Sequence, residues 1–243
     1  MDFQKHKWKK FIQLYFLNYK MEKKIDSILT SCGRYDLLAK TLESFFEFAD
    51  MPIDNFIVYD DSGKAIPESL IKQYPQIKFI EGTEKVGQIK AIDILYSHVK
   101  NEYIFFQEDD WQFYKTGFME KSMDILENEP MIMQVWIRSQ SDRNGHPVVG
   151  VPRMTPNRTR YQMMSSDYRG QWSGQSFNPG LRRLSDYKNL FPNGYAGVTT
   201  FNIKEPWTSE MQVGQVYKKA GFKAATLMNG YVKHLGNGRH ISS

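Results

Sequence analysis

Residues 102–111 read EYIFFQEDDW, an apolar run that ends in three consecutive acids. The run 102–107 is rich in aromatic and β-branched residues and predicts a buried strand. Neighbouring carboxylates at the end of such a strand repel one another, and a divalent cation removes that electrostatic cost. Because hard oxygen ligands suit Mg²⁺ or Mn²⁺, the stretch predicts a metal-binding strand end. The alternative interpretation is an acidic turn exposed to solvent.

Strand and helix patterns alternate before this stretch. Strands are predicted at 25–30, 55–60 and 77–80, and helices at 36–48, 67–73 and 87–100. This alternation with short links indicates an α/β fold, with a mostly parallel, Rossmann-like central sheet flanked by helices. Ligands bind at the carboxyl ends of parallel strands. We therefore expect a site where the polar segments 30–34, 60–63 and 108–110 follow their strands.

The pattern changes beyond residue 139. Residues 139–162 and 170–180 are rich in Gly, Pro, Ser, Asn and Arg and have no sustained period. They predict an irregular acceptor-side region of functional or mobile loops. Regular patterns return at 197–203, in a helix near 209–220 and in a last strand near 224–227.

Composition and charge exclude several classes of protein. A content of 41% hydrophobic and 24% charged residues excludes disordered and collagen-like chains. The formal charge of +5 equals the excess carried by residues 1–24, which hold seven Lys against Asp2 and Glu22. The rest of the chain is balanced, so no nucleic-acid partner is expected. Cys32 is the only cysteine, which removes disulfides and thiolate zinc clusters and indicates a cytoplasmic, reducing compartment.

Residues 1–24 place aromatic side chains at helical spacing between lysines and predict a basic amphipathic helix. The apolar run 11–17 is far shorter than the roughly 20 residues that span a bilayer. Two interpretations stay open. The helix packs on the domain, or it docks on an anionic membrane surface and makes the protein peripheral at a membrane.

Three stretches resemble family 2 glycosyltransferases. They are SILTSCGRYDLLAKTLESF (27–45), FIVYDDSG (56–63) and EKVGQIKAIDILYSHVKNEYIFFQEDDW (84–111). The first is similar to the family's opening strand and helix, and the second to its acidic nucleotide-binding turn. The third is similar to its Gly-x-x-x-Ala-x-Asn helix and Asp-x-Asp strand end. The resemblance covers about residues 25–136 and implies a GT-A fold, a nucleotide-sugar donor and a divalent metal, Mn²⁺ or Mg²⁺.

This resemblance also implies a domain organisation. The segment 1–24 precedes a single GT-A domain at 25–243. Within that domain, 25–136 is the nucleotide-sugar-binding half and 137–243 the acceptor-binding half.

The resemblance implies roles for single residues on the donor side. Asp110 ligates the metal, Glu108 faces the ribose or the metal through water, and Asp109 is a less specific donor contact. The other implied donor-binding residues are Thr30, Arg34, Asp60, Asp61, Gly87 and Lys90. Two positions depart from the family pattern: Asp93 stands where Asn is frequent, and Glu108 where Asp is usual. For Asp60 and Asp61 the alternative interpretation is turn chemistry.

The stretch 210–238, EMQVGQVYKKAGFKAATLMNGYVKHLGNG, carries a further echo of the family. It implies that Glu210 is the base that takes the acceptor proton and that His234 completes the metal ligands. A charge at a helix start is the alternative for Glu210, and a structural histidine for His234. Trp172, in GQWSGQSFNPG, would give the acceptor sugar a stacking face, or else fill the core.

The function implied is a metal-dependent glycosyltransferase. It would move a sugar from a nucleotide-diphosphate sugar, with UDP the commonest nucleotide of the family, to an acceptor hydroxyl with inversion. The acceptor would be a glycan, a lipid or a protein. A nucleotidyltransferase-like enzyme is an alternative, although 31–34 matches its Gly-rich loop poorly. A non-catalytic carbohydrate-binding module explains the 14% aromatic content but not the clustered carboxylates.

Overall fold

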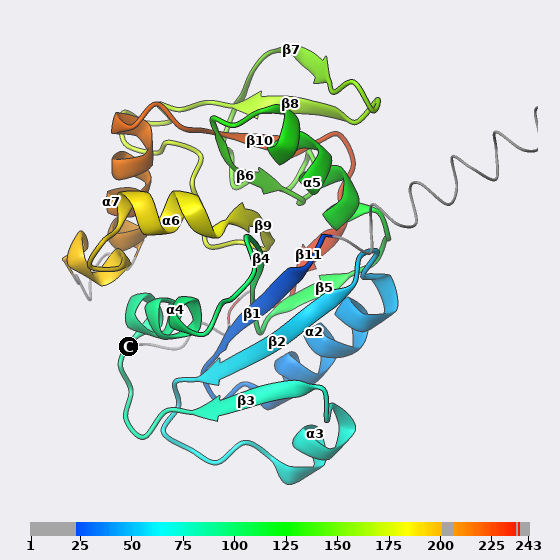
Figure 1. Ribbon diagram of the computed structural model, residues 1–243, viewed down its shortest axis with the longest axis vertical. Coiled ribbons are helices and arrows are strands. Elements are labelled where there is room, and N and C mark those ends of the chain that lie inside the picture. The colour runs from blue at the N-terminus through cyan, green and yellow to red at the C-terminus, as the bar shows by residue number, and fades with distance from the viewer. Residues whose placement is uncertain (1–22, 201–206, 237, 239–243) are drawn as a thin grey trace, which may run out of the picture.

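The computed structural model describes residues 23–200, 207–236 and 238. Its central sheet has the strand order β3-β2-β1-β4-β9 (Figure 1). The strands are β1 (Ile25–Ser31), β2 (Ile53–Asp60), β3 (Ile77–Glu81), β4 (Tyr103–Glu108) and β9 (Gly180–Arg183). All neighbours pair in parallel except β9, which runs antiparallel to β4. The expected α/β fold with a mostly parallel central sheet is confirmed.

Helices cover both faces of this sheet because its strands bury side chains on both sides. The linking helices are α2 (Tyr35–Phe48), α3 (Glu68–Gln73) and α4 (Gln88–Ser97). Leu29, Val58 and Phe105 pack in one core cluster with residues of α2 and α3. Ile28 and Phe106 point the other way, into a cluster that includes residues of α4.

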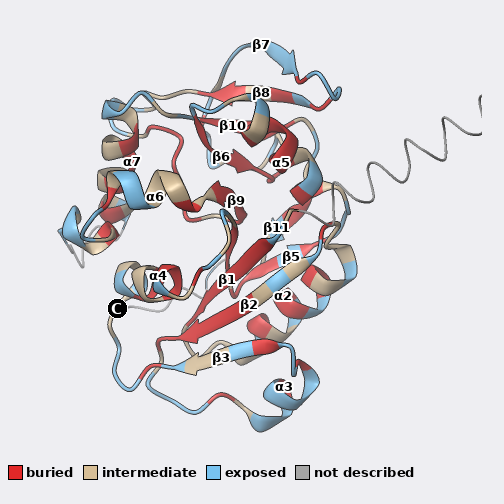
Figure 2. Cartoon of the chain, in the orientation of Figure 1, coloured by how far each residue is buried: buried red, intermediate tan, exposed pale blue. Residues whose placement is uncertain are grey.

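A second sheet has the order β6-β10-β8-β7, with α5 (Phe118–Asn128) leading into it. Its strands are β6 (Ile132–Trp136), β7 (Val148–Met154), β8 (Arg160–Met164) and β10 (Lys223–Leu227). The expectation of an irregular segment over 139–162 is therefore wrong for the β7–β8 hairpin. β7 lies at the sheet edge and is exposed along most of its length (Figure 2), so burial gives it no alternating pattern. Gly150, with φ +69°, lies within a shift of the β7–β8 register.

A short antiparallel ladder brings the C-terminal part of the chain to the end of β4. It pairs β5 (Trp111–Phe113) with β11 (Val232–His234), and His234 stands opposite Trp111. The Leu235 amide donates to the Asp110 carbonyl oxygen over 2.7 Å. These long-range contacts place His234 beside the acidic strand end.

The remaining elements are α6 (Leu184–Leu190), η1 (Tyr195–Gly197) and α7 (Trp207–Lys219). The Asp93 carboxylate accepts the amides of Tyr195 and Ala196 and the Tyr187 hydroxyl, each over 2.8 Å. Asp93 therefore ties α4 to η1 and α6. The segments 25–136 and 137–243 also exchange strands, because β9 joins the central sheet and β6 pairs with β10.

Two expectations fall wholly or partly outside the described residues. They are the N-terminal helix, apart from its last two residues, and the end of the regular segment 197–203. None of the helices in the described part of the chain is long and apolar enough to cross a membrane.

Candidate functional site

The carboxyl ends of β1, β2 and β4 bring the predicted polar segments to one edge of the sheet. In the parallel register Thr30 stands between Tyr59 of β2 and Glu108 of β4. Asp60 ends β2 beside Ser31. Strand pairing alone therefore gathers the three segments that the sequence predicts to lie together.

Glu108 is partly buried and held by two side chains. Gln88 Nε2 donates to its Oε1 over 2.6 Å, and Trp111 Nε1 donates to its Oε2 over 3.2 Å. Burial raises the pKa of Glu108 well above its usual range, and the negative charges of Asp110 and Glu210 raise it further. Glu210 of α7 is thus close enough to Glu108 for the two charges to interact, across about a hundred residues of sequence.

Asp110 is buried and uses only one of its carboxylate oxygens. Its Oδ2 lies 2.8 Å from Arg34 Nη1 and 3.3 Å from His234 Nε2, whereas Oδ1 is buried and has no hydrogen-bond partner among the described residues. Burial raises the pKa of Asp110, but His234 and Arg34 outweigh it and bring the pKa below the usual value. A Cβ on Gly236 would lie 2.1 Å from Asp110 Oδ2, so the chain passes this carboxylate only as glycine.

The chemistry of these groups fits a divalent cation. Mg²⁺ and similar ions are bound through one or two protein carboxylates, with substrate phosphates and water completing the shell. Asp110 Oδ1 is an unused buried acceptor, and His234 lies next to it. Within residues 23–200, 207–236 and 238, no group of three or more His, Cys, Asp or Glu is arranged to hold a metal by itself. A bound ion would therefore take further ligands from outside these residues.

Asp109 differs from Asp110 because both of its carboxylate oxygens have partners within the chain. Its side chain is 1% exposed, accepts Ser31 Oγ over 3.2 Å and forms an ion pair with Arg34. Burial raises its pKa to about 6, against the lowering effect of the Arg34 charge. Arg34 thus bridges Asp109 and Asp110, and Asp109 anchors the loop that follows β1.

Asp60 and Asp61 also hold loops. Asp60 accepts the amides of Gly33 and Ser62, each over 3.0 Å. Asp61 accepts the amides of Val86 and Gly87 over 2.7 and 2.8 Å. Both carboxylates are buried, and each of their oxygens accepts at least one hydrogen bond from the chain.

Gly87 caps the start of α4 with φ +85°, a conformation that favours glycine. Lys90 follows in the first turn of α4 and is exposed. Asp61 therefore fixes the position of the helix start that carries both predicted donor contacts.

Glu210 lies in the first turn of α7 and accepts the backbone N–H of Phe177. Burial raises its pKa, and the Phe177 amide and the charge of Arg182 oppose this rise. Arg182 is 4% exposed and donates through Nη2 to the carbonyl oxygens of Ser176 and Asn178. Its guanidinium lies 4.8 Å from the Phe106 ring centre. Arg182 thus supports the turn that holds Glu210.

Trp172 is partly buried and lies in the loop that leads to Phe177. Its backbone forms an isolated bridge with Tyr168. The neighbouring Gln171 carbonyl oxygen accepts Gln215 Nε2 of α7. The loop that carries Trp172 is therefore attached to the helix that carries Glu210.

Three residues of this site have no role in the sequence prediction: Gln88, Trp111 and Gly236. Trp111 directly follows the three acids, and Gly236 follows His234 by two residues. Their positions in the motifs are the available signals. Their contacts with Glu108 and Asp110 depend on long-range pairing.

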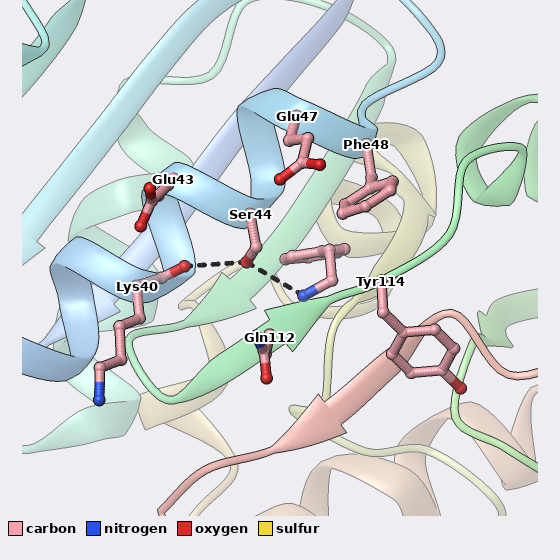
Figure 3. A pocket seen from close by; sticks show the side chains of 8 residues that line it. Lys40, Glu43, Ser44, Glu47, Phe48, Gln112 and Tyr114 are labelled. Carbon is pink, nitrogen blue, oxygen red and sulfur yellow. Dashed lines mark hydrogen bonds between the residues drawn. The ribbon is translucent and has the colours of Figure 1, made fainter.

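A surface hollow in the described part of the chain lies away from this site. It measures about 410 Å³ and lies between α2 and β5, lined by Lys40, Glu43, Ser44, Glu47, Phe48, Gln112, Phe113 and Tyr114 (Figure 3). Ser44 Oγ is occupied there, because it donates to the Lys40 carbonyl oxygen and accepts the Phe113 amide. The hollow contains none of the candidate site residues.

Comparison with known proteins gives a family and a fold. The sequence model described as "Glycosyl transferase family 2" matches residues 27–190. No curated protein sequence matches the chain.

Similar solved structures include residues 1–349 of TarS from S. aureus, with a TM-score of 0.58 and 14% identity over 86% of this chain and 59% of that one. GalNAc-T7 with UDP, GalNAc and Mn²⁺ has a TM-score of 0.57 and 12% identity over 86% of this chain and 43% of that one. TarS is also known in complex with UDP, with a TM-score of 0.56 and 15% identity over 86% of this chain and 59% of that one. The chain thus spans well under two thirds of the length of these proteins.

Proposed function

Because the chain belongs to glycosyl transferase family 2 and is a glycosyltransferase with the expected GT-A fold, we propose that it transfers a sugar from a UDP-sugar to an acceptor hydroxyl with inversion. The observation that carries the proposal is that the carboxylates at the sheet edge differ in their hydrogen bonds and in their neighbours. Asp110 has an unused buried oxygen beside His234, and Glu210 is held near Glu108 from a separate helix.

Asp110 and His234 would hold Mn²⁺ or Mg²⁺, which would neutralise the charge of the departing diphosphate. GalNAc-T7 in complex with UDP and Mn²⁺ and TarS in complex with UDP support this choice of donor and metal. Glu108 would face the ribose or the metal through water, and Arg34 would turn from the acids toward the donor phosphates.

Glu210 would take the proton from the acceptor hydroxyl. A general base works best with a pKa near the operating pH, and burial raises the pKa of Glu210 in that direction. The Phe177 amide fixes the orientation of its carboxylate. Trp172 would offer a ring face to the acceptor, a glycan or a glycan on a lipid or protein.

A panel of nucleotides tests this function. We expect UDP-sugars, in the presence of Mn²⁺, to raise the melting temperature and to be hydrolysed slowly to UDP, because a ligand of the native state stabilises it by mass action. The matched control is the same panel without Mn²⁺, which should give a smaller rise in melting temperature and slower hydrolysis, because the metal neutralises the diphosphate. Sugar binding without hydrolysis would favour a carbohydrate-binding module, and release of pyrophosphate from UTP and a sugar phosphate a nucleotidyltransferase.

We also propose that residues 1–24 contact anionic membranes from the cytoplasm. The support is their seven lysines with interleaved aromatic residues. A chain that starts at Glu22 should retain donor hydrolysis and lose part of its binding to anionic vesicles. Equal binding by both chains would favour a helix packed on the domain.

A further inference from the structure

The β7 strand exposes apolar side chains that nothing in the described residues covers. Val149 is 46% exposed, Val151 79% and Met154 61%. Three of the eight large apolar side chains that are exposed among the described residues therefore belong to this one strand. Single exposed apolar residues are ordinary, but three of them on one edge strand concentrate apolar surface there, with Val149 on the sheet face of Met163 and Met154 on the face of Arg160. Figure 2 shows the exposed strand at the end of the molecule away from α3.

The same hairpin is basic. Residues 143–166 contain four Arg and no Asp or Glu, although residues 25–243 as a whole are balanced. Arg158 and Arg160 are exposed and form no ion pair with a described carboxylate. Arg153 interacts with the hydroxyl of Tyr161, which also donates to Glu129. The positive charge of Arg153 is therefore partly compensated within the protein. The exposed positive charge of the hairpin that no described carboxylate pairs with is therefore that of Arg158 and Arg160.

Hydrogen bonds to α5 and within the turn fix the position of the β7–β8 turn. Asp124 of α5 accepts Thr155 Oγ1 and Asn157 Nδ2, the second over 2.7 Å. The Thr155 amide closes the turn on the Thr159 carbonyl oxygen over 3.0 Å. Asp124 is nearly buried, so its charge faces the turn and not the solvent. The structure thus presents the exposed valines, methionine and arginines on a fixed support.

We propose that the β7–β8 hairpin rests on an anionic lipid surface. Val149, Val151 and Met154 enter the boundary between headgroups and acyl chains, while Arg158 and Arg160 bind the lipid phosphates. Apolar side chains surrounded by basic ones are the composition that binds such interfaces, because burial and electrostatic attraction add.

A second copy of this chain fits the same edge poorly. Edge-to-edge pairing would bring identical arginines together. Pro152 lacks an amide to donate, and the irregular register around Gly150 breaks the regular row of groups that another strand needs. These features leave a lipid surface as the occupant that matches both the charge and the apolar side chains.

Sedimentation of the full-length chain with vesicles tests the proposal. We expect binding to vesicles that contain phosphatidylglycerol and little binding to pure phosphatidylcholine. Val151→Asp, and separately Arg158→Glu with Arg160→Glu, should each weaken binding about tenfold or more. Unchanged UDP-sugar hydrolysis or an unchanged melting temperature shows that each variant is folded. Binding equal to that of the unmodified chain in both variants would overturn the proposal.

The matched control is Ile71→Asp with Lys72→Glu on α3, at the opposite end of the molecule (Figure 1). Ile71 is 38% exposed, and Lys72 forms an ion pair with Glu68, one helical turn earlier in α3. Ile71→Asp adds one negative charge, as Val151→Asp does, and the two changes together shift the net charge by −3, against −4 for the double arginine variant. Both control variants should leave vesicle binding unchanged. An equal loss in the control would show a general charge effect and would overturn the assignment to the hairpin.

Hydrogen exchange locates the contact. With anionic vesicles, the amides of residues 148–160 should gain protection, because lipid excludes water from the unpaired edge. Protection confined to residues 1–24 would overturn the proposal and leave the N-terminal contact standing. So would a dimer in lipid-free solution that Val151→Asp dissociates, since that result would assign the surface to a second copy.

Discussion

The carboxylates at the sheet edge fall into two groups with opposite uses. Asp60, Asp61 and Asp109 accept backbone or hydroxyl donors from the loops after β1 and before α4, and they are buried by doing so. Asp110 and Glu210 lie around Glu108 and face other acids, with Asp110 retaining an unused oxygen. Carboxylates at one edge of the sheet therefore differ in the groups that already bond to them.

The comparison shows that a cluster of acids does not by itself identify which carboxylate can bind a cation or a proton. A buried carboxylate whose acceptors are filled stabilises the fold, since removing it leaves several donors unpaired. A buried carboxylate with an empty acceptor beside like charges is costly unless a cation or a proton joins it. Substitutions of carboxylates from both groups, and of Trp172, test whether the two groups differ in their effects on activity and on stability.

Asp110→Asn should have the largest effect. It should reduce Mn²⁺-dependent hydrolysis of the donor to background, roughly a thousandfold or more, because a metal ligand supplies several kcal/mol of charge stabilisation. The fold should stay intact, because Arg34 keeps its ion pair with Asp109 and the amide removes the repulsion between Asp110 and Glu108. Steady-state hydrolysis with varied Mn²⁺ measures this, and hydrolysis within a few-fold of the unmodified chain would contradict it.

Glu210→Gln should reduce transfer to the acceptor by about a hundredfold or more, the usual worth of a general base, with little change in donor affinity. The amide retains the shape but does not accept a proton. Transfer kinetics and a donor titration on the same variant measure the two quantities.

The control is Glu68→Gln, which removes an acid from the first turn of α3 together with its exposed ion pair to Lys72. If Glu210→Gln turns over like Glu68→Gln, Glu210 is a helix-start charge, and Asp109 or Asp167 becomes the next candidate base. A collapse of donor affinity in Glu210→Gln would instead assign the residue to the donor site or the fold.

Asp61→Asn should act mainly on stability. It should lower the free energy of unfolding by about 1–3 kcal/mol, because the neutral amide cannot accept both the Val86 and Gly87 amides as a carboxylate does. Urea unfolding measures the loss. A stable variant with abolished donor binding would show that Asp61 contacts the nucleotide directly.

Trp172→Ala should have the smallest effect. We expect a rise of about three- to tenfold in the acceptor KM, the worth of one lost aromatic contact, and an unchanged donor KM. Initial rates with each substrate varied in turn measure both constants. An unchanged acceptor KM would place the ring in the core and not in the acceptor site.

The sequence predicts the central sheet well because β1, β2 and β4 are buried on both faces. Such burial selects continuous apolar runs like FIVY (56–59) and YIFF (103–106), and the polar residues that follow these runs mark the site edge. β7 was not predicted, because an exposed edge strand interrupted by Gly150 and Pro152 has no period of two. Local patterns record burial, so an element without burial leaves little signal.

The site is predicted in part for a similar reason. The segment that contains Glu108 and Asp110 is visible as a motif, whereas His234 and Glu210 are indicated only by the resemblance to the family and by no local pattern. His234 reaches Asp110 only through the pairing of β5 with β11, and Glu210 approaches Glu108 only through the packing of α7. The ion pair of Arg34 with Asp109 is one reason why Asp110 and not Asp109 has an oxygen without a partner. The sequence does not reveal this difference, because the two acids are adjacent and identical.

Mn²⁺ affinity in the presence of UDP tests the division most directly, when it is measured for Asp110→Asn and Asp109→Asn side by side. The account predicts that Asp110→Asn loses Mn²⁺ binding, whereas Asp109→Asn binds within a few-fold of the unmodified chain and loses stability. Retained binding in Asp110→Asn together with lost binding in Asp109→Asn would contradict it.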